Sequence, residues 1–130
     1  MLTGFVNPEK IPDNLYQSRL LVLSRPESKQ AQGGFPTKLG EYLATGVPVA
    51  VTRVGEIPNY LIDGQNAFLA EPGDIESFAD AMKRALVDKK VSRKVGLAGR
   101  EIAIRCFSHS IQGRMIKEFL SRKINNRRRN

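Results

Sequence analysis

The chain has one cysteine, Cys106, and one histidine, His109, among its 130 residues. A single cysteine excludes a disulfide within the chain and is typical of a reducing compartment. We expect Cys106 to lie on a helix in the core, because the nearby His109 has no further residues that would complete a catalytic set. The sequence contains no Ser/His/Asp arrangement and no cysteines and histidines at metal-ligand spacing, so a metal site is not expected.

Long apolar stretches are also missing from the sequence. No apolar run approaches the roughly 20 residues that a membrane-spanning helix needs, and no signal peptide opens the chain. Hydrophobic residues make up 41% of the composition, enough for the core of one domain. We therefore expect a cytoplasmic protein without a transmembrane segment, and leave open whether it also lies against a membrane surface.

Acidic residues are absent from the end of the chain. The net charge is +8, and five of the basic residues follow position 121 with no acid among them: Arg122, Lys123, Arg127, Arg128 and Arg129. Without these five the net charge falls to +3. We expect residues 1–121 to form the domain and residues 122–130 a solvated, disordered basic tail. The tail could meet anionic lipid, but nucleic acid is not an expected partner, because no aromatic residues are interleaved with the basic ones.

The rest of the chain is organised around residues 33–48, which read Gly-Gly-Phe-Pro-Thr-Lys-Leu-Gly-Glu-Tyr-Leu-Ala-Thr-Gly-Val-Pro. This pattern predicts a glycine-rich loop, a helix over 37–45, a left-handed stop at Gly46 and a strand over 47–52 buried on both faces. Pro36 suits the first helical position. The start of such a helix offers free N–H groups and a positive dipole end to an anion.

This segment supplies the predicted binding site. The free N–H groups and Lys38 would bind phosphate oxygens, and Glu41, one turn after Thr37, would accept hydrogen bonds from ribose hydroxyls. The alternative is an ordinary helix whose charged side chains are solvated. The predicted binding residues are Gly33, Gly34, Phe35, Pro36, Thr37, Lys38 and Glu41.

The remaining patterns predict an α/β fold. We expect strands over 1–6, 20–23 and 67–70 beside the one over 47–52, and helices over 12–17, 58–62, 74–87, 91–106 and from 108 onward. The alternation of strands and helices is typical of a parallel, Rossmann-like sheet with helices on both faces. Two apolar stripes are expected to face the core: Ile75, Phe78, Met82 and Leu86, and then Ile111, Met115 and Phe119.

A polar loop over 24–34 follows the second predicted strand. Ligands of open α/β sheets bind beyond the carboxyl ends of the strands, so Arg25 or Lys29 in this loop could meet phosphate or sugar. The alternative is a mobile surface loop.

Residues 20–74 resemble the donor-binding half of retaining nucleotide-sugar glycosyltransferases of the GT-B fold, the group 1 or family 4 type. The matching segments are Leu-Leu-Val-Leu-Ser at 20–24, Gly-Phe at 34–35, and the runs over 41–49, 52–58, 63–69 and 72–74. In that family two glutamates, with seven residues between them, bracket the glycine loop. The second corresponds to Glu41 and holds the ribose, whereas the first, which reaches the donor sugar, falls on Gly33. The version found here resembles a subgroup of bacterial sugar transferases.

The resemblance implies the incomplete C-terminal domain of a GT-B transferase acting in bacterial polysaccharide biosynthesis, with a nucleotide-sugar as donor substrate and no cofactor. The acceptor half, two strands and a basic loop of the family are missing. Strand edges left open in this way favour self-association or a partner chain. A sugar or lipid-linked acceptor would be reached through the missing N-terminal half. The alternative is a non-catalytic nucleotide-binding or assembly module. Catalytic residues, donor and acceptor stay unassigned.

Overall fold

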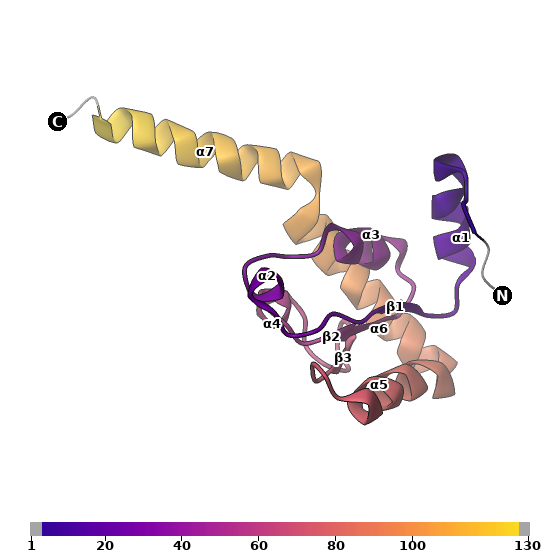
Figure 1. The fold of residues 1–130 in the computed structure, drawn as a ribbon. Helices are drawn as coiled ribbons and strands as arrows, with labels where there is room; N and C mark the ends of the chain where they lie inside the picture. Colours follow the sequence, from indigo (N-terminus) through magenta and orange to yellow (C-terminus); the bar gives the residue numbers. More distant parts are fainter. Residues whose placement is uncertain (1–3, 128–130) are drawn as a thin grey trace.

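The computed structural model describes residues 4–127, which form a parallel sheet between layers of helices (Figure 1). The strands are β1 (Leu21–Leu23), β2 (Val49–Thr52) and β3 (Phe68–Ala70), in the order β1-β2-β3. Both pairings are parallel, and Ala50 of β2 lies opposite Val22 on one side and Phe68 on the other. The predicted α/β class is therefore confirmed.

Helices connect and cover these strands. Figure 1 shows α3 and α5 on opposite faces of the sheet, and α7 projecting away from the body. The helical elements are η1 (Pro8–Lys10), α1 (Ile11–Gln17), α2 (Lys29–Gln32), α3 (Thr37–Thr45), α4 (Ile57–Tyr60), α5 (Ile75–Val87), α6 (Lys89–Ile102), the π-helical turn η2 (Ala103–Phe107) and α7 (His109–Arg127).

One hydrophobic cluster lies on each face of the sheet. Successive side chains of a strand point to opposite faces, so Val49 and Val51 of β2 pack with the α3 side, where Leu39 and Leu43 are fully buried. On the other face Ala50, Phe68 and Ala70 pack against Ala81 and Ala85 of α5 and Val95 of α6. All four residues of β2 are buried, as expected for the central strand of a covered sheet.

Helix α6 approaches the body closely because two of its residues are glycines. A Cβ at Gly96 would lie 2.3 Å from the Gly46 carbonyl oxygen, and one at Gly99 would lie 2.6 Å from the Asn66 carbonyl oxygen. Gly46 itself ends α3 in the left-handed conformation, with φ of 75°, as its position in the sequence predicts. The C-terminal end of α3 is thereby fixed against α6.

Several element predictions were wrong or displaced. Residues 4–6 form no strand, and residues 1–3 lie outside the described part of the chain. Three strands rather than four are therefore present within residues 4–127. Helix α2 was not predicted; Ser28 begins it by accepting a hydrogen bond from the Ala31 amide at 3.1 Å. The predicted helix over 74–87 is confirmed, with Asp74 capping α5 through the Ser77 amide at 2.9 Å.

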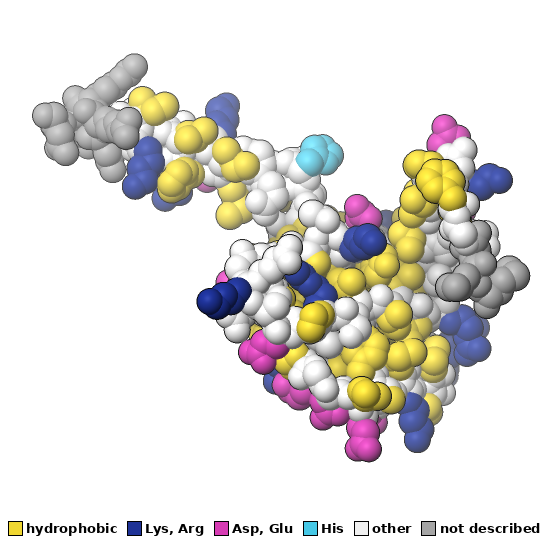
Figure 2. Space-filling model, in the orientation of Figure 1, with side chains coloured by type: hydrophobic (Ala, Val, Ile, Leu, Met, Phe, Trp, Pro, Cys, Tyr) yellow, Lys and Arg dark blue, Asp and Glu magenta, His cyan; other side chains and the backbone are white. Residues whose placement is uncertain are grey.

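The predicted apolar stripes of two helices do not face the core throughout. Ile75 on α5 is 86% exposed, because the buried positions of that helix are Ala81 and Ala85. Met115 and Phe119 on α7 are 55% and 54% exposed, because this helix leaves the body after its first turn (Figure 1). Basic and apolar side chains lie side by side along it (Figure 2). The expected disordered tail is also wrong for residues 122–127, which continue α7.

Candidate functional site

The start of α3 is the centre of the predicted site. Pro36 is the N-cap, with φ of −72° and ψ of 123°, and not the first helical residue as predicted; the helix begins one residue later, at Thr37. No side chain in the described part of the chain caps this helix, and the Leu39 amide donates to the Pro36 carbonyl at 3.0 Å. The amides of Thr37 and Lys38 have no hydrogen-bond acceptor among residues 4–127. They are available to an anion, which the positive end of the helix dipole also favours.

A hollow of about 500 Å³ opens beside these amides. It lies at the carboxyl end of β1, the edge at which ligands of parallel sheets bind. Two cations border it, Lys38 from α3 and Arg25 from the loop after β1. Its complete lining is Leu23, Arg25, Gln30, Gly34, Phe35, Pro36, Thr37 and Lys38. Five of the seven predicted binding residues are therefore brought together here, along with Arg25.

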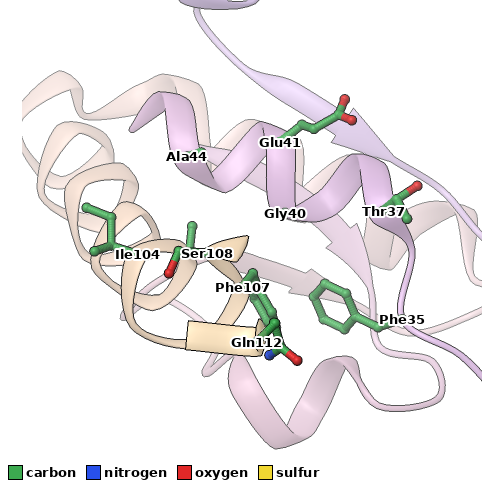
Figure 3. Close-up of a pocket in the computed structure, with 10 residues that line it drawn as sticks. Phe35, Thr37, Gly40, Glu41, Ala44, Ile104, Phe107, Ser108 and Gln112 are labelled. Atoms are coloured by element: carbon green, nitrogen blue, oxygen red, sulfur yellow. The ribbon is translucent and has the colours of Figure 1, made fainter. Parts of the chain in front are cut away.

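Glu41 lies one turn further along α3, and its side chain is exposed. In Figure 3 its carboxylate and the Thr37 hydroxyl point to the same side of α3, away from Phe107. Glu41 does not line the hollow described above. Together with Phe35 and Thr37 it lines a second cavity of about 420 Å³ between α3 and the start of α7. The two cavities share Phe35 and Thr37, so a ligand at the start of α3 could extend from one to the other.

Gly33 is the one predicted residue that lines neither cavity. It ends α2 with φ of −89°, and its amide donates to the Lys29 carbonyl at 3.2 Å. This is not the left-handed region, so the backbone conformation here does not require a glycine. Lys29 also lines neither cavity.

Two long-range contacts that the sequence did not reveal hold the loop after β1. The Thr52 hydroxyl accepts from the Arg25 amide at 2.9 Å and donates to the Arg25 carbonyl at 3.0 Å. This buried threonine at the end of β2 thus fixes the backbone of the residue that borders the hollow. Further on, Gly55 has φ of 55° and lies so close to the Ala31 carbonyl that a Cβ would stand 2.1 Å from its oxygen. The backbone of the loop after β2 is therefore in direct contact with the backbone of α2.

An ion-pair group around Arg84 lies away from the site. Arg84 donates to Asp63 through two nitrogens, both at 3.1 Å, and to Asp80 at 2.8 Å. The hydrogen bond to Asp63 raises the pKa of the Arg84 guanidinium, which is therefore charged at any working pH. Asp63 also accepts from the Leu69 amide at 2.7 Å. This group fixes the turn before β3 and has a structural role.

Residues 4–127 hold no cluster of three or more histidine, cysteine, aspartate or glutamate side chains that could bind a metal ion. Within the same range, no helix combines the length and apolar character that crossing a bilayer demands.

The sequence of the chain matches that of a known protein family. The model of the family "Glycosyl transferases group 1" matches residues 1–88. N-acetyl-alpha-D-glucosaminyl L-malate synthase of Bacillus anthracis is 38% identical over 82 residues, which are 63% of this chain and 20% of that protein. 2-Deoxystreptamine N-acetyl-D-glucosaminyltransferase of Niallia circulans is 25% identical over 123 residues, 94% of this chain and 30% of that protein. The chain thus spans a fifth to a third of the length of these relatives.

Solved structures share the fold. Sucrose-phosphate synthase of Thermosynechococcus elongatus matches with a TM-score of 0.75 and 24% identity, over 93% of this chain and 30% of that one. Anabaena Alr3699/HepE in complex with UDP matches with a TM-score of 0.74 and 23% identity, over 85% and 29%. The C-terminal domain of a group 1 glycosyl transferase from Francisella tularensis matches with a TM-score of 0.69 and 22% identity, over 82% and 52%.

Proposed function

The chain belongs to the group 1 glycosyltransferase family, and from this premise we propose that it binds the nucleoside diphosphate part of a nucleotide-sugar donor. The observation that supports the proposal is the start of α3, where two free amides, two neighbouring cations and a carboxylate one turn further on border two cavities that share Phe35 and Thr37. A diphosphate joined to a ribose carries the complementary groups in the same order.

Each group at the site has a defined part in this proposal. The amides of Thr37 and Lys38 donate hydrogen bonds to phosphate oxygens, and the helix dipole adds to the attraction. The side chains of Lys38 and Arg25 offset the remaining phosphate charge. The carboxylate of Glu41 accepts hydrogen bonds from ribose hydroxyls, as acidic residues do in other nucleotide sites. Charge-assisted hydrogen bonds of this kind are stronger than neutral ones, so few groups suffice.

The base and the sugar of the donor are less defined. HepE was solved with UDP and with UDP-glucose, whereas a relative from Mycolicibacterium smegmatis is named as GDP-mannose-dependent. We take a uridine nucleotide as the first candidate. Position 33 carries glycine where the family resemblance calls for a glutamate that reaches the sugar, so sugar recognition here depends on other groups.

Glycosyl transfer also needs groups around the acceptor hydroxyl and the leaving phosphate. We propose that an acceptor-binding half supplies them, and that the acceptor is a sugar or a lipid-linked sugar of a bacterial polysaccharide pathway. The chain spans 20% and 30% of two relatives, which supports the proposal that a separate acceptor-binding half supplies these groups. No cofactor is part of the proposal, because the nucleotide-sugar is itself the substrate. Catalytic residues remain unassigned on this chain.

Helix α7 supports the proposals on location and association. It exposes large apolar side chains beside basic ones, with Phe119 and Lys123 in contact at 5.7 Å from ring centroid to Nζ. Such a face suits a second copy, a partner chain or an anionic membrane surface. The proposed setting is cytoplasmic, and the exposed face of α7 suits contact with a membrane surface there.

Titration calorimetry with UDP, GDP and ADP tests the proposal. We expect at least one nucleotide to bind, and the Kd to rise about tenfold in Glu41→Gln and in Lys38→Ala, because each loses a charge-assisted contact. Matched controls are Glu76→Gln and Lys83→Ala on α5, both exposed and on the helix that covers the opposite face of the sheet from α3. The proposal fails if no nucleotide binds, or if the control substitutions weaken binding equally.

Turnover separates the two candidate functions. If a nucleotide binds but no glycosyl transfer follows when an acceptor-binding half is supplied, the chain is a nucleotide-binding or assembly module. Transfer that depends on both halves supports the transferase. The module is the second candidate because Gly33 lacks the carboxylate that reaches the donor sugar in the family.

A further inference from the structure

Three aromatic rings from distant parts of the chain meet beside the proposed nucleotide site. Phe35 comes from the glycine loop (residues 33–36), Tyr60 from the end of α4, and Phe107 from the π-helical turn η2. The centroids of Phe35 and Phe107 are 4.4 Å apart, those of Tyr60 and Phe107 5.0 Å, and those of Phe35 and Tyr60 5.5 Å. These separations are in the range in which aromatic pairs attract one another beyond simple burial.

The glycine loop has few other restraints. Within the described residues its backbone hydrogen bonds run from Gly33 to Lys29 and from Leu39 to Pro36, each joining residues four or fewer positions apart. Such local bonds set the shape of the loop but not its position on the body. The ring of Phe35 makes the contacts to distant segments. Only Pro36 separates Phe35 from Thr37 and Lys38, which present the free amides.

Phe107 is the ring that connects the loop to the body. Phe107 is partly buried, and its Cβ would lie 3.9 Å from a Cβ built on Gly40. Phe107 therefore packs against the start of α3 as well as against the ring of Phe35 (Figure 3). Phe107 is the last residue of the π-helical turn, and the wider winding of this turn gives its side chain a direction different from that in a continuous α-helix. Turns of this type occur often at functional sites.

The first turn of α7 holds this turn in place. The side-chain amide of Gln112 donates to the Cys106 carbonyl at 2.6 Å, and Ser108 accepts from the Ile111 amide at 3.4 Å. Both contacts lie directly next to Phe107. The ring is therefore fixed from the α7 side and reaches across to the glycine loop.

From this arrangement we propose that Phe107 is a positioning residue for the nucleotide site. It holds Phe35, and through it the amides at the start of α3, in the orientation that binds the diphosphate. Tyr60 closes the cluster from the third side. The inference rests on the proposed function, and it assigns to the junction of α6 and α7 a part in ordering the site.

Hydrogen exchange of the free protein, followed by UDP titration, tests the proposal. In Phe107→Ala we expect the hydrogen-bonded amides on either side of the loop, Gly33 and Leu39, to exchange about tenfold faster, because the contact between Phe107 and Phe35 is lost. The UDP Kd should rise about tenfold for the same reason. Amides of β2 report global stability and should change less than those of the loop. Phe107→Tyr keeps the ring and should restore both values. Phe119→Ala on α7 is the control.

The outcomes separate this proposal from the function on which it rests. If Phe107→Ala accelerates loop exchange but even the unmodified protein binds no nucleotide, the positioning of the loop stands and the proposed function fails. If UDP binds and neither loop exchange nor Kd changes in Phe107→Ala, Phe107 is not a positioning residue. Should Phe107→Ala not fold, Tyr60→Ala gives the same test from a ring that is 37% exposed, with a smaller expected acceleration confined to the loop.

Discussion

Replacing Gly96 by alanine should destabilise the protein, although alanine normally favours a helix. The added Cβ would lie 2.3 Å from the Gly46 carbonyl oxygen and 2.9 Å from the Pro48 nitrogen. The first distance is 0.7 Å short of the 3.0 Å below which such contacts are essentially never found. Both neighbours are backbone atoms between α3 and β2, so they cannot turn aside as a flexible side chain would.

The size of the effect follows from two opposing terms. Alanine in a helix is favoured over glycine by about 0.5–1 kcal/mol, whereas overpacking a core costs about 1–3 kcal/mol. Because the clash is with backbone, we take the upper part of the second range and expect a net loss of about 1–2 kcal/mol. For a domain of this size that lowers the Tm by roughly 3–8 °C.

Gly113→Ala is the matched control. Gly113 also lies within a helix, α7, but a Cβ there would meet nothing within 4 Å. Only the helix preference acts, so this variant should be more stable by about 0.5–1 kcal/mol. Urea and thermal unfolding followed by circular dichroism measure both. If Gly96→Ala is as stable as Gly113→Ala, α6 does not approach α3 as closely as described, and the account of this packing is wrong.

Three further substitutions test other contacts. Thr52→Val removes both hydrogen bonds to Arg25, so it should lower the free energy of unfolding by about 1–3 kcal/mol and weaken UDP binding. Thr52→Ser should retain both stability and binding. Equal stability of the two variants would contradict the role of the hydroxyl. Asp63→Ala removes the acceptor of the Leu69 amide and of two Arg84 nitrogens, and should cost about 1–3 kcal/mol in urea unfolding; a loss near zero would contradict the structural role of this group. Phe119→Ser should change stability by less than about 0.5 kcal/mol and reduce self-association in sedimentation velocity; a large loss of stability would mean that α7 packs on the body.

Local signals in the sequence predicted the centre of the fold well. The bounds of α3 follow from a proline before it, a glycine in left-handed conformation after it, and two leucines one turn apart that are fully buried. Asp74 likewise predicted the start of α5. These features depend on neighbours within a few residues, so the sequence alone defines them.

The sequence was a poor guide to what each helix faces. Ile75, Met115 and Phe119 have the spacing of core residues. However, α5 buries small alanines instead, and over most of its length α7 has no neighbour among residues 4–127. Periodicity predicts an apolar face, and only the positions of the other elements decide whether that face is covered.

In the site, too, the sequence predicted local features but not contacts between distant residues. The residues at the start of α3 were predicted from the motif, because they are contiguous. Arg25 was expected near the site only as one of two basic residues in a loop. The hydroxyl of Thr52 that holds it, 27 positions away, and the contact between Phe35 and Phe107 depend on the folded chain. No spacing rule links such distant positions.

An NMR titration of the ¹⁵N-labelled protein with UDP tests the central claim most directly, because it reports which backbone amides meet the ligand. We predict that the largest shifts fall on Thr37 and Lys38, with smaller ones at Gly34 and Glu41, and that Glu41→Gln weakens the whole response. Shifts confined to the opposite face of the sheet, near Phe78 and Met82, or no shifts at millimolar UDP, GDP or ADP, would contradict it.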